Sequence, residues 1–330
     1  MRFGVGLFTA EALPGDSRAS RDLYREVIEY ARIAEDSGLD SFWISEHHFD
    51  PEGYMPSVFA VAGAVGSVTS RLRLTVGVPA GLHHPLRLAE DFATLDCLTS
   101  GRVTVLLGAG TRQFEHAVLG INRDTAAERR TETLQILSKA FKASPFEFSG
   151  RHFSFPSVVV TPTCFTVGGP PILLGGVDDS SLGLDPSLHR GFVLDSALEW
   201  SELVRLTREV RKKGPGLELA IQSYGFITQS GDPWEVIRKG FLHLRRKYNA
   251  WTGRGGVVNP SPTSYRLLLG TPEAVADNLL EYLDALDAPV EFVLRLSYPG
   301  LDAATVAAAL GLFGQVANLV RARLRTLTPS

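Results

Sequence analysis

The spacing of apolar residues changes repeatedly along the chain, and this alternation predicts strands and helices in turn. Short runs of apolar and β-branched residues predict buried strands, whereas apolar residues that recur every three or four positions predict helices with one buried face. The expected strands cover residues 3–8, 41–45, 72–78, 102–107, 171–176, 191–195, 217–228 and 289–297. The expected helices cover residues 22–37, 55–69, 85–99, 126–141, 199–213 and 233–248, a segment from 271 onward and the C-terminal segment. Residues 178–188 are a poor helix candidate because Gly183 and Pro186 interrupt them.

Strands that alternate with helices predict a parallel sheet joined by helical crossovers, and eight such units can close into a barrel. An open, doubly wound sheet is the alternative. The first strand is not followed by the GxGxxG pattern of dinucleotide-binding sheets, and the chain has no phosphate-binding GxxxxGK[ST] loop. We therefore predict an α/β fold, a (β/α)8 TIM barrel, built by residues 1–330 as one domain.

Two segments interrupt the alternation. Residues 142–170 contain four prolines and little periodicity, which predicts a loop-rich insertion after the fourth βα unit, with an edge hairpin as one element it can contain. Residues 252–264 are rich in Gly, Pro and Ser, which predicts a mobile loop.

Composition narrows the class of protein. The formal net charge is −3, and no basic stretch is mixed with aromatic residues, so no nucleic-acid partner is expected. Two cysteines exclude a disulfide scaffold and a cysteine-built metal centre. No run of about 18 apolar residues occurs and no signal peptide is recognisable, so we expect a cytoplasmic protein with no membrane contact.

The densest group of titratable residues follows the second predicted strand and reads Glu46-His47-His48, with Asp50 close behind. Side chains alternate along a strand, so Glu46 and His48 are expected on one side and His47 on the other. Three interpretations are open. A histidine faces the barrel mouth while Glu46 fixes a neighbour's tautomer, or the group is a hydrogen-bonded cluster that ties strand to loop. The third is a metal site, but adjacent histidines ligate poorly and we predict no metal ion.

Glycine-rich turns end two further strands. Gly108-Ala109-Gly110 and Gly175-Gly176 let backbone N–H groups approach a ligand, and Ser180 and Ser181 follow at a helix start, an arrangement that suits a phosphate. Asp178 and Asp179 oppose it, because carboxylates repel a phosphate dianion. Before the third helix, His84 either caps that helix or lines the mouth.

Several fragments together resemble one family. They are the N-terminal RFGVGLF, the unit AEDSGLDSFWISEHHF, the segment HPLRLAEDFATLDCLTSGRV leading to GAG, FSFPSVVVTPTCFTVGGPPILLGG, and GTPEAVADNL. The chain is similar to the bacterial luciferase-like flavin-dependent monooxygenases, and Glu-His-His-Phe resembles the luciferase side of that family. The resemblance implies a barrel that takes up reduced FMN from a separate flavin reductase by diffusion. Oxygen adds to the flavin, and the peroxyflavin oxygenates a small organic substrate.

The resemblance also implies roles for individual residues. His47 would lie near the reactive edge of the flavin, as acid/base or as a hydrogen-bond partner of the peroxide, and Glu46 would support the strand end. Val76 and Gly77 would pack against the isoalloxazine. The implied phosphate-binding turns contain Gly108, Ala109, Gly110, Arg112, Gly175, Gly176, Ser180 and Ser181, and the implied substrate pocket contains His48 and Ser223. Helices 55–69 and 85–99 resemble the family's dimer interface and imply a homodimer.

Two departures from the luciferase pattern keep other functions open. Ala109 stands where the catalytic subunit has an arginine, so that Arg112 is the nearest basic residue, and Val177-Asp178 replaces Glu-Ser. The first alternative is a non-catalytic or flavin-binding-only partner subunit, and the second is a deazaflavin-dependent oxidoreductase, against which Glu-His-His-Phe argues. Arginine outnumbers lysine, the usage of a GC-rich bacterium, which is compatible with a substrate from secondary metabolism.

Overall fold

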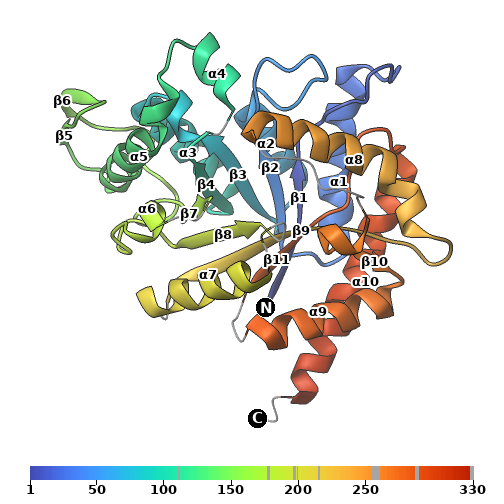
Figure 1. The fold of residues 1–330 in the computed structure, drawn as a ribbon. Coiled ribbons are helices and arrows are strands. Elements are labelled where there is room, and N and C mark those ends of the chain that lie inside the picture. The colour runs from blue at the N-terminus through green and yellow to red at the C-terminus, as the bar shows by residue number, and fades with distance from the viewer. Residues whose placement is uncertain are drawn as a thin grey trace.

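A computed structural model describes residues 1–110, 112–176, 179–195, 198, 200–214, 216–253, 261–286 and 290–327. Eight parallel strands form a closed barrel (Figure 1). In spatial order the sheet runs β9, β11, β1, β2, β3, β4, β7 and β8, and β8 pairs again with β9. The barrel strands are β1 (Arg2–Phe8), β2 (Ser41–Ser45), β3 (Arg73–Pro79), β4 (Val103–Gly108), β7 (Ile172–Gly175), β8 (Gly191–Asp195), β9 (Glu218–Ile227) and β11 (Glu291–Arg295). The predicted (β/α)8 TIM barrel is confirmed.

Alternate side chains of these strands build two separate cores. One set fills the barrel interior and consists of Trp43, Leu106, Leu173, Val193, Ala220 and Val293. Their strand neighbours, such as Phe42, Ile44, Val105 and Phe192, face outward and pack under the helices in the larger core. Because both faces of each strand are buried, the sequence of a strand reads as a continuous apolar run, which is why the strands are recognisable from sequence.

Helices surround the barrel (Figure 1). The longer ones are α1 (Ser20–Asp36), α2 (Val58–Val68), α3 (Pro85–Thr99), α5 (Ala126–Ala140), α7 (Trp200–Lys213), α8 (Pro233–Thr252), α9 (Pro272–Leu286) and α10 (Ala303–Leu327). His84 accepts a hydrogen bond from the backbone N–H of Leu86 and caps α3, so the capping interpretation of this residue is confirmed. The poor candidate at 178–188 is a single turn, α6 (Asp179–Leu182).

Sequence reasoning misplaced or missed several elements. Helix α8 extends four residues beyond its predicted end at residue 248 and stops at Gly253, whose φ of 68° is left-handed. The short helix α4 (Gln113–Val118) and the strand β10 (Leu268–Gly270), which pairs with β9, were not predicted. The single-turn helices η1 (Ala80–Leu82), η2 (Arg123–Thr125) and η3 (Thr263–Tyr265) were missed as well. These elements have only three to six residues, too few to show a hydrophobic period.

The insertion contains the expected hairpin. Strands β5 (Phe146–Ser149) and β6 (Ser154–Val158) pair in an antiparallel manner and form a separate two-stranded sheet. It projects from the barrel beside α5 (Figure 1). In the predicted mobile loop, residues 254–260 lie outside the described part of the chain.

Helix α10 has the length and apolar composition of a membrane-crossing helix. Half of its apolar window is buried inside the protein, as in the core helix of a barrel. Among the described residues no other helix has this length and composition.

Candidate active site

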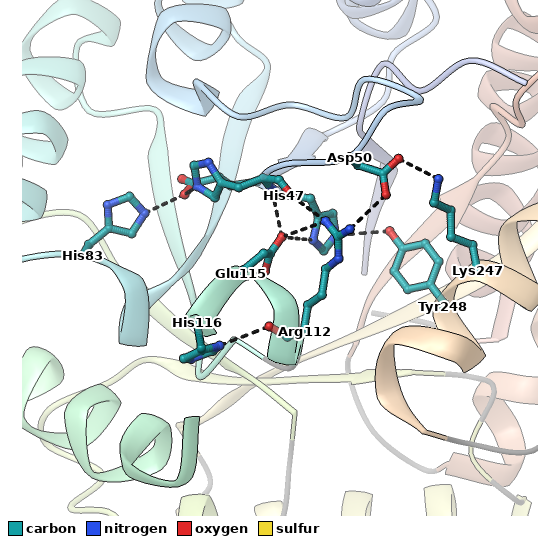
Figure 2. Close-up of polar contacts among 10 residues, drawn as sticks. His47, Asp50, His83, Arg112, Glu115, His116, Lys247 and Tyr248 are labelled. Atoms are coloured by element: carbon teal, nitrogen blue, oxygen red, sulfur yellow. Dashed lines mark hydrogen bonds and ion pairs between the residues drawn. The ribbon is translucent and has the colours of Figure 1, made fainter. Parts of the chain in front are cut away.

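The segment that follows β2 meets three other loops at the carboxyl end of the barrel (Figure 2). The loop between β3 and α3 contributes His83, α4 and the residue before it contribute Glu115 and Arg112, and the end of α8 contributes Lys247 and Tyr248. This is the face at which barrel enzymes place their active sites, because the βα loops converge there.

A buried carboxylate lies at the centre of one half of this site. Glu46 is only 4% exposed, and a single oxygen of its carboxylate contacts Nε2 of His48 and, at 2.6 Å, Nε2 of His83. The expectation that Glu46 and His48 share one side is confirmed. His83 was not predicted, because it comes from a different loop and no local pattern links it to Glu46.

The electrostatics of this half follow from the shared carboxylate. The hydrogen bond to Glu46 raises the pKa of His48, although burial opposes the shift. Burial by itself would raise the pKa of Glu46, but the bonds from His48 and His83 outweigh it and the pKa is lowered. The three donor atoms lie within 4.8 Å of one another and could therefore hold a metal ion. In the structure they satisfy each other by hydrogen bonds instead.

His47 points to the other half of the site, as expected from the alternation. Its ring lies between three aromatic rings, with centroid distances of 5.6 Å to Tyr54, 5.7 Å to Tyr248 and 5.0 Å to Trp251. The Tyr248 hydroxyl lies 3.3 Å from Nε2, and Nδ1 is 3.7 Å from a Glu115 oxygen. His47 is therefore the one histidine of the pair with polar groups facing both ring nitrogens.

Glu115 links His47 to the backbone of the next residue. It accepts a hydrogen bond of 2.8 Å from the backbone N–H of His48. Burial raises the pKa of Glu115, but the contacts with His47 and His48 and the charge of Arg112 outweigh it, and the pKa is lowered. Glu115 thus stays ionised beside the imidazole of His47.

Arg112 is occupied by groups of the protein. Its guanidinium donates to the backbone carbonyl of His48, lies 3.2 Å from Asp50 and 3.7 Å from Glu115, and stacks 4.5 Å from the centroid of Trp251. The residue is 8% exposed, and its Nε has no partner among the described residues. Asp50 and Glu115 therefore already balance the positive charge of Arg112, the residue that the sequence suggested as a partner of the phosphate.

Helix α8 is held against the loop after β2 by ion pairs that sequence reasoning missed. The Lys247 ammonium lies 2.6 Å from both Asp50 and Glu52, and His243 lies 2.8 Å from Glu52. Positions 243, 247 and 251 are four residues apart and share one face of the helix. This side of α8 therefore lies over His47, and its Trp251 and the neighbouring Tyr248 contact the imidazole ring.

Glycines lie at or near the ends of three adjacent strands. Gly108 and Gly175 end β4 and β7, and Gly77 lies two residues before the end of β3. A Cβ added at Gly108 would meet nothing nearer than the Val78 carbonyl at 3.7 Å, whereas at Gly77 and Gly175 it would lie 3.3 Å and 3.2 Å from the Leu106 side chain. The Ser45 hydroxyl oxygen is buried and has no partner among the described residues. The open backbone at Gly108 and the unpaired, buried Ser45 hydroxyl are two features that a planar ring with polar edges, such as isoalloxazine, would use.

The other predicted cofactor residues are spread over the same end of the barrel. Gly110 adopts a left-handed φ of 84° and packs on buried His116, and the carbonyl of Ala109 lies beside Gly81. Gly176 is also left-handed, with open space around it, and the buried Ser181 donates to its carbonyl at 3.4 Å. The side chain of Ser180 lies outside the described part of the chain. Buried Arg130, which was not predicted, donates to the Gly175 carbonyl at 3.2 Å and brings a positive charge beneath this turn.

Two predicted side chains face away from the site. Val76 belongs to the outer core between barrel and helices, so only its backbone borders the mouth. Ser223 is buried in β9 and alternates with Tyr224, on the same outward side as Ile221 of the outer core. A side chain with that orientation packs under the helices.

Comparisons with known proteins agree with the predicted family and the barrel fold. A family model described as luciferase-like monooxygenase matches residues 1–288. An uncharacterized protein of Sinorhizobium fredii is 27% identical over 338 residues, which cover 95% of each chain. The oxygenase component of the flavin-dependent trigonelline monooxygenase of Acinetobacter baylyi is 29% identical over 184 residues, 55% of this chain and 50% of that protein. This second match thus spans half of the relative's length.

Solved structures give the same picture of the fold. The monooxygenase RslO1 from Streptomyces bottropensis has a TM-score of 0.84 at 21% identity, over 96% of this chain and 98% of that one. An F420-dependent secondary alcohol dehydrogenase has a TM-score of 0.76 at 17% identity, over 97% of this chain and 99% of that one. At these identities the likeness shows the fold alone.

The protein is a barrel enzyme with its polar site at the carboxyl end of the strands. It belongs to the luciferase-like monooxygenase family, and the family predicted from the sequence is confirmed. Its family membership places it among the monooxygenases, which are oxidoreductases.

Proposed function

We propose that the protein is the oxygenase component of a two-component, FMN-dependent monooxygenase that acts on a small organic substrate. The observation that carries the proposal is the position of His47. It lies at the carboxyl end of the barrel beside the glycine-lined mouth, under a cover of aromatic rings, with an ionised carboxylate near one ring nitrogen. Reduced FMN, when bound, supplies the electrons with which O2 is activated, so that one oxygen atom enters the substrate.

The residues that would hold the flavin form two groups. Gly108 leaves the end of β4 bare for the ring, Gly77 lies in the neighbouring strand β3, and the unpaired Ser45 hydroxyl would bond a polar ring edge. At the turn after β7, the left-handed Gly176 and the charge of Arg130 beneath Gly175 support a phosphate. In this proposal the basic residue at the flavin phosphate is Arg130, whereas the sequence predicted Arg112.

His47 would hold or move the proton in the reaction. With Nδ1 toward Glu115 and Nε2 toward the Tyr248 hydroxyl, its ring is oriented at both ends, so a proton can be stored on either nitrogen. Trp251 and Tyr248 limit the access of water to this proton. Glu46 does not contact His47 in the structure; it holds His48 and His83 and acts as a positioning residue.

The proposal is tested by titrating the apoprotein with oxidised and with photoreduced FMN. We expect the reduced form to bind, and failure of both forms to bind would overturn the proposal. Exchanging His47→Ala should leave the dissociation constant of reduced FMN within about twofold and reduce product formation by about 100-fold, the contribution of a general acid or base. A matched control is His84→Ala, because His84 caps α3. Unchanged turnover in His47→Ala would refute the role given to His47.

One observation favours a second candidate, a partner subunit that lacks the reaction. Arg112, the nearest basic residue to the turn after β4, is balanced by Asp50 and Glu115. This candidate predicts that reduced FMN does not bind, or binds without oxygen consumption. A deazaflavin-dependent oxidoreductase would turn over its substrate with a reduced or oxidised deazaflavin and consume no oxygen, so oxygen consumption and turnover measured together separate all three.

The expected partners follow from the same proposal. Helix α2 is apolar almost throughout and packs beside α3; its Ala60 is exposed, and its Phe59 and Ala64 are half-buried. These two helices are therefore our proposed homodimer interface. The flavin reductase would act by diffusion of reduced FMN. We further propose a cytoplasmic location and a substrate from secondary metabolism. Sedimentation of the wild type and of an Ala60→Glu variant tests the dimer, and a dimeric variant would refute this interface.

A further inference from the structure

Two histidines and a glutamate meet at one point of the barrel mouth, although they come from two different loops. Glu46 and His48 follow β2, and His83 precedes α3. One carboxylate oxygen of Glu46 contacts Nε2 of both imidazoles, and the three donor atoms lie within 4.8 Å of one another. His47 is not a member of this group. The objection to a metal site that rested on the adjacent histidines His47 and His48 therefore does not apply here.

The three side chains make up the ligand set of a known class of metal site. Two imidazoles and one carboxylate hold Zn²⁺ in catalytic sites, where a fourth position stays open for water or substrate. Zinc bonds to nitrogen and oxygen are about 2.0–2.2 Å long, so tetrahedral ligand atoms lie roughly 3.3–3.6 Å apart. The donor atoms of Glu46 and His83 are 2.6 Å apart in the structure. A separation of these atoms by about 1 Å therefore makes room for the ion.

The position of the three side chains gives an ion both a counter-charge and a route. The Glu46 side chain is 2% exposed, whereas those of His48 and His83 are 19% and 27% exposed. The carboxylate thus lies deepest, and the imidazoles border the solvent. Both histidines have a fixed backbone, because the N–H of His48 donates to Glu115 at 2.8 Å and that of His83 donates to the Ala80 carbonyl at 3.3 Å. Such outer contacts orient the ligands of a metal before it binds.

We propose that Glu46, His48 and His83 bind one Zn²⁺ ion. The ion replaces the two hydrogens that the Nε2 atoms donate to Glu46, and these hydrogens move to Nδ1 or to solvent, so that each Nε2 presents a lone pair. By the order of first-row affinities the site holds Zn²⁺ more tightly than Fe²⁺ or Mn²⁺. Mg²⁺ and Ca²⁺ prefer oxygen ligands, and only Glu46 supplies them. The bound ion ties the segment after β2 to the loop before α3. This inference does not rest on the proposed function, since it needs no flavin.

The test is a calorimetric titration of the metal-free and flavin-free protein with Zn²⁺. We expect one ion per chain with a dissociation constant of about 1 μM or lower, and no binding of Mg²⁺ at about 1 mM. The decisive variant is His83→Gln, because the new amide can still donate to Glu46 but does not ligate zinc. It should weaken Zn²⁺ binding by at least about 100-fold, since loss of an outer contact of a ligand already costs about 10- to 100-fold.

The controls are His47→Ala and His84→Ala, which remove the sequence neighbours of the two proposed histidine ligands. Each should change the dissociation constant of Zn²⁺ by less than about threefold. Zn²⁺ should also raise the midpoint of thermal unfolding of the wild type but not of His83→Gln, because only a folded chain with all three ligands binds it.

Three results would overturn the proposal. They are absence of Zn²⁺ binding to the wild type, equal affinity of the wild type and His83→Gln, and a loss in either control equal to that in His83→Gln. Because no flavin takes part in the titration, Zn²⁺ binding and the proposed FMN-dependent reaction succeed or fail separately.

Discussion

Two buried glutamates at opposite ends of the barrel, Glu291 and Glu46, are equally inaccessible but held in different ways. Each is 4% exposed. At the amino end of the strands, Glu291 accepts from Ser41 and from the Trp43 indole N–H at 3.2 Å, and its other oxygen is 3.1 Å from Arg2. At the carboxyl end, Glu46 is held by the imidazoles of His48 and His83.

The difference lies in what the partners can do. The partners of Glu291 keep their protonation state at any ordinary pH, because arginine stays charged and an indole N–H or a hydroxyl is a fixed donor. Both partners of Glu46 are imidazoles, a side chain that exists in a neutral and a charged form, and the carboxylate raises the pKa of His48. The polar cluster at the amino end therefore has partners of fixed protonation state, and the cluster at the carboxyl end has partners that can gain or lose a proton.

The largest expected effect is on stability at the amino end. Glu291→Ala should destabilise the protein by about 3 kcal/mol, because it removes the acceptor of buried donors and one of the two carboxylates that pair with Arg2. The matched exchange Glu46→Ala should cost less, about 1–2 kcal/mol, because His48 and His83 can lose a proton. Urea unfolding of both variants at neutral pH measures the two. A larger loss for Glu46→Ala would reverse the comparison.

The second-largest expected effect is on the pH dependence of stability, which should differ between the two ends of the barrel. The raised pKa of His48 means that its ion pair with Glu46 stabilises the fold fully below the ordinary histidine pKa of about 6.5 and is lost as pH rises through the folded-state value. In Glu46→Gln the pKa of His48, followed by NMR of the ring protons, should fall toward the ordinary value. The stability difference between wild type and this variant should shrink as the pH rises. A His48 pKa that stays raised in Glu46→Gln would show that Glu46 is not its cause.

The smallest effect concerns two serines of the same strand. Ser41 bonds Glu291 and the Trp43 indole, whereas the hydroxyl of Ser45 is buried without a partner among the described residues. Ser41→Ala should cost about 1–2 kcal/mol, and Ser45→Ala should be within about 0.5 kcal/mol of wild type. If the Ser45 hydroxyl serves the flavin, its loss should instead weaken binding of reduced FMN by roughly fivefold. Thermal unfolding and flavin titration on the same two proteins measure both quantities.

Much of the fold was predictable because burial on both faces makes each barrel strand an apolar run, and because eight runs alternate with helices. The failures have a common cause. α4, β10 and the last turn of α8 are short or lie at element ends, where tertiary contacts override the local period. Helix α4 supplies Glu115 and the last turn of α8 supplies Trp251, so two of the site residues that were missed came from missed parts of the fold. His83 and Lys247 lie in or beside predicted elements, and only their partners were missed.

The sequence by itself determined the family, the barrel and the location of His47 after the second strand, since each depends on residues that are close together in the chain. Only the tertiary structure decided which groups surround that histidine. His83 before α3, Glu115 in α4, and Lys247 and Trp251 in α8 come from three segments separated by dozens of residues. They meet because barrel closure brings the carboxyl ends of all strands together. The tertiary structure also pairs Arg112 with Asp50 and Glu115. A sequence shows that a side chain is charged, but it does not show which group neutralises that charge.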